Sequence, residues 1–205
     1  MDRDERLNTI THLIGTACAL AGLVVLVVQA SLQGNPWKIV SFSVFGITLV
    51  ALYLFSTIYH GISGRTKTIF QKLDHAAIYF LIAGTYTPFT LVTLRGAWGW
   101  SLFGVIWGLA IAGVVQDMLL VTKKRIISVV IYLLMGWLVI LAIRPLARAL
   151  PEAGIVWLVA GGLCYTIGVL FYALDKRFPY GHEIFHLFVL AGSSCHFLAI
   201  LLYVA

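Results

Sequence analysis

Seven long apolar stretches, separated by short polar breaks, dominate the hydrophobic pattern of this 205-residue sequence. An α-helix needs about 20 predominantly apolar residues to cross the hydrocarbon core of a bilayer. The pattern therefore predicts seven transmembrane helices, at residues 9–30, 38–60, 73–93, 98–120, 126–143, 154–174 and 182–204. We expect an all-α fold, a seven-transmembrane helix bundle in which residues 1–205 form one domain, because no linker interrupts the pattern.

Basic residues in the breaks predict the orientation of this bundle. If successive helices alternate in direction, ten of the fourteen Lys and Arg residues fall on one side of the membrane: Arg3, Arg6, Arg65, Lys67, Lys72, Lys123, Lys124, Arg125, Lys176 and Arg177. Only Lys38, Arg95, Arg144 and Arg148 fall on the other side. Short loops rich in Lys and Arg face the cytoplasm. The N-terminus is therefore expected to be cytoplasmic and the C-terminus to lie outside.

Three features inside or between the spans predict local structure. Pro88 lies within the third span and should free a backbone carbonyl and kink the helix. Gly104 and Gly108 form a G-x-x-x-G pattern, which lets the backbone of a neighbouring helix approach closely. The pair Arg144-Pro145 is expected to end the fifth helix.

Composition agrees with a membrane protein and excludes two other classes. The chain is 61% hydrophobic and 11% charged, whereas a soluble domain carries about 25% charged residues. The net charge of +6 does not indicate a nucleic-acid partner, because the basic residues form no continuous face. Cys18, Cys164 and Cys195 all lie inside apolar runs, which argues against a disulfide framework.

The predicted topology gathers polar residues at the cytoplasmic ends of several helices. Five of the six histidines fall at this level, and so do acidic and amide residues: His12, His60, His75, His182, His186, Glu5, Asn8, Asp74 and Glu183. Ionisable groups inside a membrane are costly and usually functional. This level of the bundle is therefore the candidate functional site.

Helical spacing places several of these residues on common faces. His182 and His186 are four residues apart, so both rings lie on one face of the seventh helix. Ser56 and His60 have the same spacing on the second helix. A catalytic zinc ion takes three protein ligands and keeps a fourth position for water. His60 and the histidine pair would provide three ligands, and Asp74 could hold or deprotonate the water.

Other interpretations of the same residues remain open. The Ser56 hydroxyl could bond back to the carbonyl four residues earlier, as membrane-helix serines commonly do. Glu5, Asn8 and His12 share one face of the first helix, and Asn8 and His12 fit interhelical hydrogen bonds better than metal ligation. His196 is about 15 Å along the helix from His186, too far to share its ion, and is expected to bond a neighbouring helix.

Taken together, these motifs resemble those of the progestin and adipoQ receptor family. The similarity lies in Ser56-x-x-x-His60, Leu73-Asp74, and His182-x-x-x-His186 followed by His196. The start of the chain and the segment from Gly192 to Phe197 resemble its bacterial branch, the hemolysin III proteins. The resemblance implies a Zn²⁺ ion bound by the three histidines of the cluster, with Asp74 near its water and Ser56 in a supporting position.

The resemblance also implies a multi-pass protein of the bacterial inner (plasma) membrane and kinship with membrane ceramidases, which hydrolyse lipid amides. We therefore expect a zinc-dependent hydrolase of lipid amides or esters, with a membrane lipid or fatty acid as its substrate or ligand. One alternative is a non-enzymatic sensor or regulator of membrane lipid homeostasis with a structural zinc. Another is a pore-forming cytolysin, which would need a continuous polar path through the helices.

Overall fold

The computed structural model describes residues 3–119, 125–174, 177 and 180–205, and its described residues form helices and short connections without any strand. Seven helical segments are long and apolar enough to cross a membrane, which confirms the expected all-α, seven-span class. The elements are α1 (Arg3–Leu32), α2 (Pro36–Gly61), α3 (Arg65–Pro88), the π-helix η1 (Phe89–Leu94), α4 (Ala97–Leu119), α5 (Arg125–Trp137), the 3₁₀-helix η2 (Leu138–Ala142), α6 (Ile143–Ala149), α7 (Glu152–Ala173) and α8 (Gly181–Tyr203).

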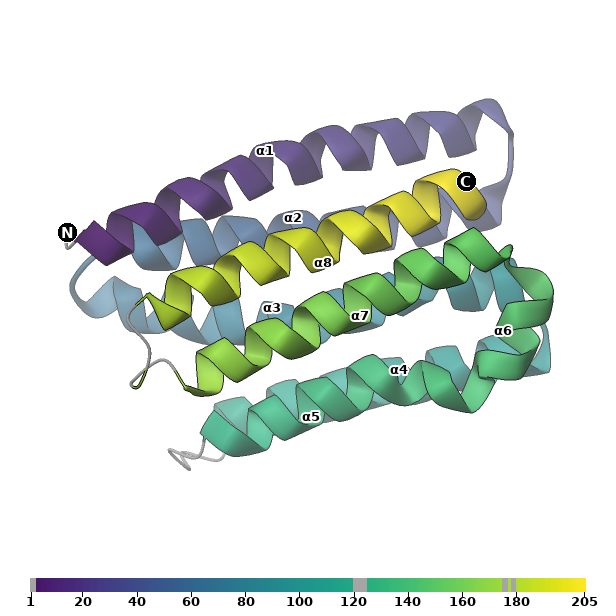
Figure 1. Ribbon diagram of the computed structural model, residues 1–205. Coiled ribbons are helices and arrows are strands. Elements are labelled where there is room, and N and C mark those ends of the chain that lie inside the picture. The colour runs from purple at the N-terminus through teal and green to yellow at the C-terminus, as the bar shows by residue number, and fades with distance from the viewer. Residues whose placement is uncertain (1–2, 120–124, 175–176, 178–179) are drawn as a thin grey trace.

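Two helices begin well before the apolar stretches that predicted them. The first starts at Arg3 instead of residue 9, and the third at Arg65 instead of residue 73. The extra turns are polar, so the hydropathy pattern does not predict them. A helix can continue beyond the apolar region of the membrane and expose its polar side chains to water. Both extensions lie at the same end of the bundle (Figure 1). They carry charged residues, among them Glu5 on α1 and Lys67 on α3.

The predicted end of the fifth helix at Arg144-Pro145 is wrong. The chain stays helical through η2 and α6 and ends at Ala149, before Pro151. Pro145 is the third residue of α6, directly after the 3₁₀ segment, and a proline is tolerated in the first turn of an α-helix. Arg144 and Arg148 therefore lie on this helical segment instead of in a loop.

Tyr86 of α3 explains why the fifth span changes to 3₁₀ geometry. Its hydroxyl lies 2.9 Å from the carbonyl oxygens of both Met135 and Gly136, and it accepts the Val139 N–H at 2.8 Å. A side chain inserted in this way satisfies backbone groups that the α-helical ladder would otherwise pair. The helix is thus locally rewound and tied to α3.

Pro88, which is expected to kink the third helix, marks a change of backbone geometry. The α-helical part of the third span ends at Pro88, and the next six residues form η1. The π-helical pattern closes with a bond from the Arg95 N–H to the Thr90 carbonyl at 3.2 Å. Proline lacks the N–H that would continue the α-helical ladder, and the π turn accommodates the resulting mismatch.

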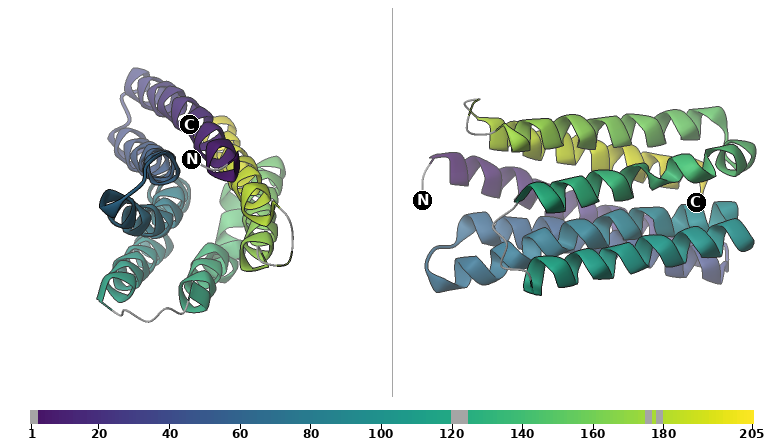
Figure 2. Two further views of the ribbon diagram at one scale, coloured as in Figure 1. Left: turned by 90° about the vertical axis from the view of Figure 1, so that its left-hand side faces the viewer. Right: turned by 90° about the horizontal axis from the view of Figure 1, so that it is seen from below.

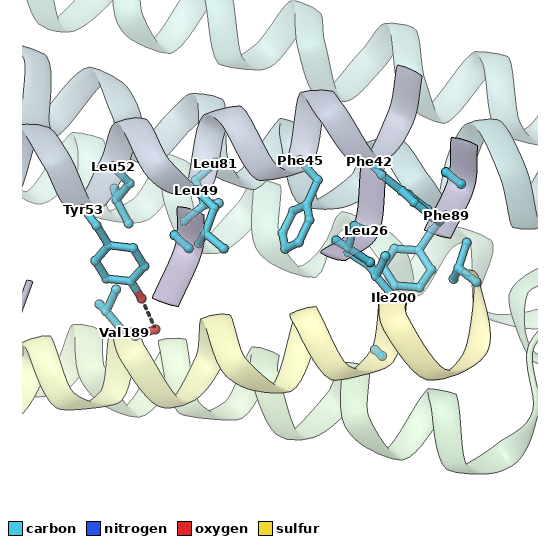
Figure 3. Close-up of a cluster of buried hydrophobic side chains, with 14 of the residues drawn as sticks. Leu26, Phe42, Phe45, Leu49, Leu52, Tyr53, Leu81, Phe89, Val189 and Ile200 are labelled. Atoms are coloured by element: carbon cyan, nitrogen blue, oxygen red, sulfur yellow. Dashed lines mark hydrogen bonds between the residues drawn. The ribbon is translucent and has the colours of Figure 1, made fainter. Parts of the chain in front are cut away.

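The helices run side by side, and the two termini lie at opposite ends of the bundle (Figure 1). Seen from the N-terminal end, α1 to α4 form one side of the bundle, and α5, α7 and α8 form the other (Figure 2). The main core lies where α1, α2 and α3 meet α8, and Figure 3 shows Leu26 beside Ile200 and Tyr53 beside Val189 at this interface. Large apolar side chains such as Val24 and Ile111 are exposed on the outside, as expected of a surface that faces lipid.

The G-x-x-x-G pattern is not a helix contact within this chain. Gly104 and Gly108 are exposed, and a Cβ added at either position would meet nothing within 4 Å. The close approach occurs instead at Gly113, against the ring of Tyr79. The prediction of an interhelical contact at Gly104 and Gly108 is therefore wrong, since the helix is rotated so that this face points outward.

The arrangement brings the predicted basic loops to one end of the bundle. The start of α1 and the α2–α3 turn lie at that end, and so do the end of α4, the start of α5, the end of α7 and the start of α8 (Figure 1). Lys123, Lys124 and Lys176, which contribute to the basic count, lie outside the described residues. The basic bias predicts that this end faces the cytoplasm.

A reporter fused to Ala205 tests this orientation. We expect the fusion to report a location outside the cytoplasm, because the termini lie at opposite ends of the bundle. A matched fusion at the N-terminus should report a cytoplasmic location. A cytoplasmic signal from Ala205 would overturn the orientation.

Candidate metal centre

Three histidines from two helices meet at the N-terminal end of the bundle. His60 is the penultimate residue of α2, while His182 and His186 occupy the first two turns of α8. One nitrogen from each ring can be chosen so that all three lie within 4.8 Å of one another. The spacing of four along α8 turns both of its rings toward α2, as predicted from the sequence.

Ring-to-ring distances show how closely the three imidazoles crowd together. The ring centroids of His182 and His186 are 4.5 Å apart, and those of His60 and His186 are 5.0 Å apart. His60 and His182 are separated by 5.4 Å. Three imidazoles around one point form a donor set that suits a transition metal such as zinc.

Unpaired buried nitrogens provide a test of whether the residues fit a metal. Both ring nitrogens of His186 and Nε2 of His60 are buried and have no hydrogen-bond partner among the described residues. Leaving a buried polar group unsatisfied costs about 1–3 kcal/mol, and an ion near the cluster would give a partner to His60 Nε2 and to one of the two nitrogens of His186. A zinc ion would satisfy neutral imidazole nitrogens, and the residues therefore fit the metal that the sequence predicts.

Asp74 and Ser56 lie beside this cluster. Asp74 is on the third turn of α3, and Ser56 is one turn before His60 on α2. Ser56 and Asp74 are neighbouring side chains, and both line the cavity that His182 and His186 also line. The Ser56 hydroxyl is buried and makes no bond back to a carbonyl of its own helix, so the alternative interpretation of this serine is wrong.

The first helix brings a fourth histidine to the cluster. The ring centroid of His12 lies 4.0 Å from that of His186 and 5.2 Å from that of Tyr53. Both nitrogens of His12, and Oδ1 of Asn8, are buried without a hydrogen-bond partner in the described part of the chain. The interhelical hydrogen bonds predicted for these atoms are therefore not formed. His12 instead lines the cavity next to the cluster.

Glu5 makes the contact that sequence reasoning missed. Its Oε2 lies 2.7 Å from Nδ1 of His60, and its Oε1 accepts a hydrogen bond from Lys67 Nζ at 2.7 Å. The only signal in the sequence was the shared face of Glu5, Asn8 and His12. This signal predicts which way α1 turns its polar residues but does not identify the partners on α2 and α3.

His196 and His75 lie apart from the three-histidine cluster. The His196 ring stacks on Tyr165 at 5.5 Å and packs against Gly161, while its Nδ1 has no hydrogen-bond partner in the described residues. At Nδ1, ring packing takes the place of the hydrogen bond to a neighbouring helix that the sequence predicts. The backbone carbonyl of His75 accepts a hydrogen bond from Tyr132 at 3.1 Å.

A cavity of about 680 Å³ extends from the cluster into the bundle. Its polar end includes His12, Ser56, Asp74, His182 and His186. Beyond them the wall is mainly apolar, with residues from the third, fourth, fifth and sixth spans such as Leu81, Ile82, Phe89, Leu102, Leu133, Leu146, Ile155 and Val169. This volume is within the range of about 300–1,000 Å³ that small-molecule sites usually have.

The fold and the cluster together define a class, the seven-helix membrane proteins that carry a group of histidines at one end of the bundle. Within this class, a family model described as haemolysin-III related matches residues 2–197. The chain therefore belongs to the haemolysin III family, which confirms the resemblance predicted from its motifs.

Curated relatives extend from bacteria to animals. The chain is 44% identical to Hemolysin-3 of Bacillus cereus over 203 residues, which are 98% of this chain and 92% of the relative. It is 29% identical to the human monocyte to macrophage differentiation factor over 199 residues, 94% of this chain and 81% of that protein. The adiponectin receptor protein of Drosophila melanogaster is 24% identical over 234 residues, covering 93% of this chain and 48% of the receptor.

Proposed function

We propose that this protein is a zinc-dependent hydrolase of a lipid amide or ester in the bacterial inner membrane. The observation that carries the proposal is that His182 and His186 of the cluster, together with Asp74, line a mainly apolar cavity of about 680 Å³. Ligand sites of this kind are mainly apolar with a few converging polar groups. The chemistry then takes place at the polar end.

The dimensions of the cavity favour a lipid chain. Asp74 and Phe89 both line it, and the helix between them spans about 22 Å at 1.5 Å per residue. A long hydrocarbon chain can lie along this wall with its amide or ester carbonyl at the histidines. The apolar wall excludes water from the chain, while the polar end admits the reacting group.

His60, His182 and His186 would hold the ion in this proposal. When bound, zinc polarises a carbonyl and lowers the pKa of water to about 7. The Asp74 carboxylate would accept a proton from the attacking water at one of its oxygens. A new bond joins the water oxygen to the carbonyl carbon, the C–N or C–O bond breaks, and the leaving amine or alcohol takes the proton that Asp74 accepted, which returns Asp74 to its carboxylate form.

Fatty-acid release from a panel of ceramides and phospholipids tests the proposal. The purified full chain, loaded with zinc, should release fatty acid from at least one lipid of the panel. Release should stop when a chelator removes the metal and return when zinc is restored. Zinc-loaded protein that releases no fatty acid from any of these lipids would contradict the hydrolase.

Two other functions follow from the names of relatives. The adiponectin receptor relative favours a sensor of membrane lipid state, which would retain zinc and bind a fatty acid in the cavity without turnover. The Bacillus cereus relative is named Hemolysin-3, and pore formation would need a polar path through the helices. The apolar wall of the cavity beyond the histidines supports the hydrolase over the pore.

A further inference from the structure

We propose that Glu5 is a positioning residue for the metal centre, because it fixes the tautomer and orientation of the His60 ring. This inference rests on the zinc site of the proposed function. Histidine ligands usually donate their second ring N–H to a carboxylate or carbonyl, which orients the ring and makes its other nitrogen a better donor to the metal. The contacts of His60 have this arrangement.

The hydrogen bond assigns the proton on the His60 ring. A carboxylate oxygen only accepts hydrogen bonds, so the 2.7 Å contact between Glu5 Oε2 and His60 Nδ1 places the proton on Nδ1. In the neutral ring, Nε2 then carries the lone pair. Nε2 is also the buried nitrogen without a partner. Glu5 therefore determines which atom of His60 is presented to the ion.

Lys67 holds Glu5 in the orientation that this role requires. Its ammonium group donates to the second carboxylate oxygen at 2.7 Å, and it lies over the Tyr59 ring, 5.1 Å from the ring centroid. With one oxygen on Lys67 and the other on His60, the carboxylate has little freedom to rotate. The pairing joins α1, α2 and α3 directly at the metal centre.

The solvent exposure of Glu5 and Lys67 indicates that their ion pair adds little to the stability of the fold, which distinguishes a role in positioning His60 from a structural role. The Glu5 side chain is 30% exposed and that of Lys67 29%. Ion pairs this open to solvent contribute little to stability, so removing the Glu5–Lys67 pair should leave the metal-free fold nearly intact. The His60 side chain, by contrast, is only 4% exposed. A change in the orientation of its ring should therefore alter zinc binding.

Zinc affinity measured by chelator competition on the purified full chain tests the proposal. Glu5→Ala should weaken zinc binding by about 10–100-fold, the usual effect of removing a partner of a metal-binding histidine. Glu5→Gln should weaken it less, because the amide oxygen still accepts the Nδ1–H. The melting temperature of the metal-free protein should change little in either variant.

Asp117→Ala is the matched control. Asp117 also accepts a hydrogen bond from another helix, from Ser128 Oγ at 2.6 Å, but this contact involves no histidine of the cluster. Its loss should leave zinc affinity unchanged. Wild-type affinity in Glu5→Ala, or an equal loss in Asp117→Ala, would overturn this inference alone. A wild-type chain that binds no zinc would instead overturn the proposed function and this inference with it.

Discussion

Replacing His186 with Ala is expected to remove most of the bound zinc from the purified protein. His186 is buried, and its ring centroid lies within 5.0 Å of those of His60 and His182. Removing a residue that supports a ligand lowers metal affinity by up to about 100-fold. Removing one of the three ligands themselves should lower zinc affinity by more than this. His182→Ala should have the same effect.

The same variants should lose the stabilisation that zinc provides. The ion would join the end of α2 to the start of α8, and a metal that binds only the folded state adds its binding free energy to stability. Melting temperatures with and without zinc should therefore differ for the wild type and converge for His186→Ala. His196→Ala is the control and should keep its zinc, because His196 stacks on Tyr165 away from the cluster. Equal zinc losses in the two variants would contradict the assigned ligands.

Asp74→Asn is expected to keep zinc and lose hydrolysis. The three histidines remain, so metal content and melting temperature should stay close to those of the wild type. The amide cannot accept the proton from water, and loss of a general base slows a reaction by about 10²–10⁴-fold. The two side chains have almost the same shape, so altered packing is a poor explanation for such a loss. The measurement compares fatty-acid release with zinc content for each protein.

Glu152→Gln provides a matched change from carboxylate to amide at an exposed position at the start of α7. It should release fatty acid at the wild-type rate. If Asp74→Asn lost its zinc and its stability together, Asp74 would be a direct ligand of a closed structural site. That result would favour the sensor over the hydrolase.

The apolar pattern was sufficient to predict seven spans, because each stretch must match the thickness of the bilayer. It failed where helical structure continued for other reasons. The first turns of α1 and α3 are polar, and α6 continues through Pro145 because a proline is tolerated in the first turn of a helix. The 3₁₀ segment depends on the hydroxyl of Tyr86, which is distant in sequence and gives no local signal.

The candidate site was partly predictable for a similar reason. Alternating topology is enough to bring His60, His182 and His186 to one level, and helical spacing is enough to place His182 and His186 on one face of α8. Contacts between helices depend on how each helix is rotated about its axis, and short motifs do not specify this. The Glu5–His60 pair and the packing of His196 against Gly161 therefore emerged only from the structure. The exposure of Gly104 has the same cause, because its motif predicts a helix contact but does not specify which way the helix is rotated.

Elemental analysis of the purified wild-type chain and of a His60, His182 and His186 triple alanine variant tests the central claim most directly. Both proteins should be prepared in parallel, with their folded state checked by helical content. We predict one zinc per chain in the wild type and almost none in the triple variant, since the three rings supply the ligands. Equal zinc in the two proteins, or no zinc in the wild type, would contradict the metal centre.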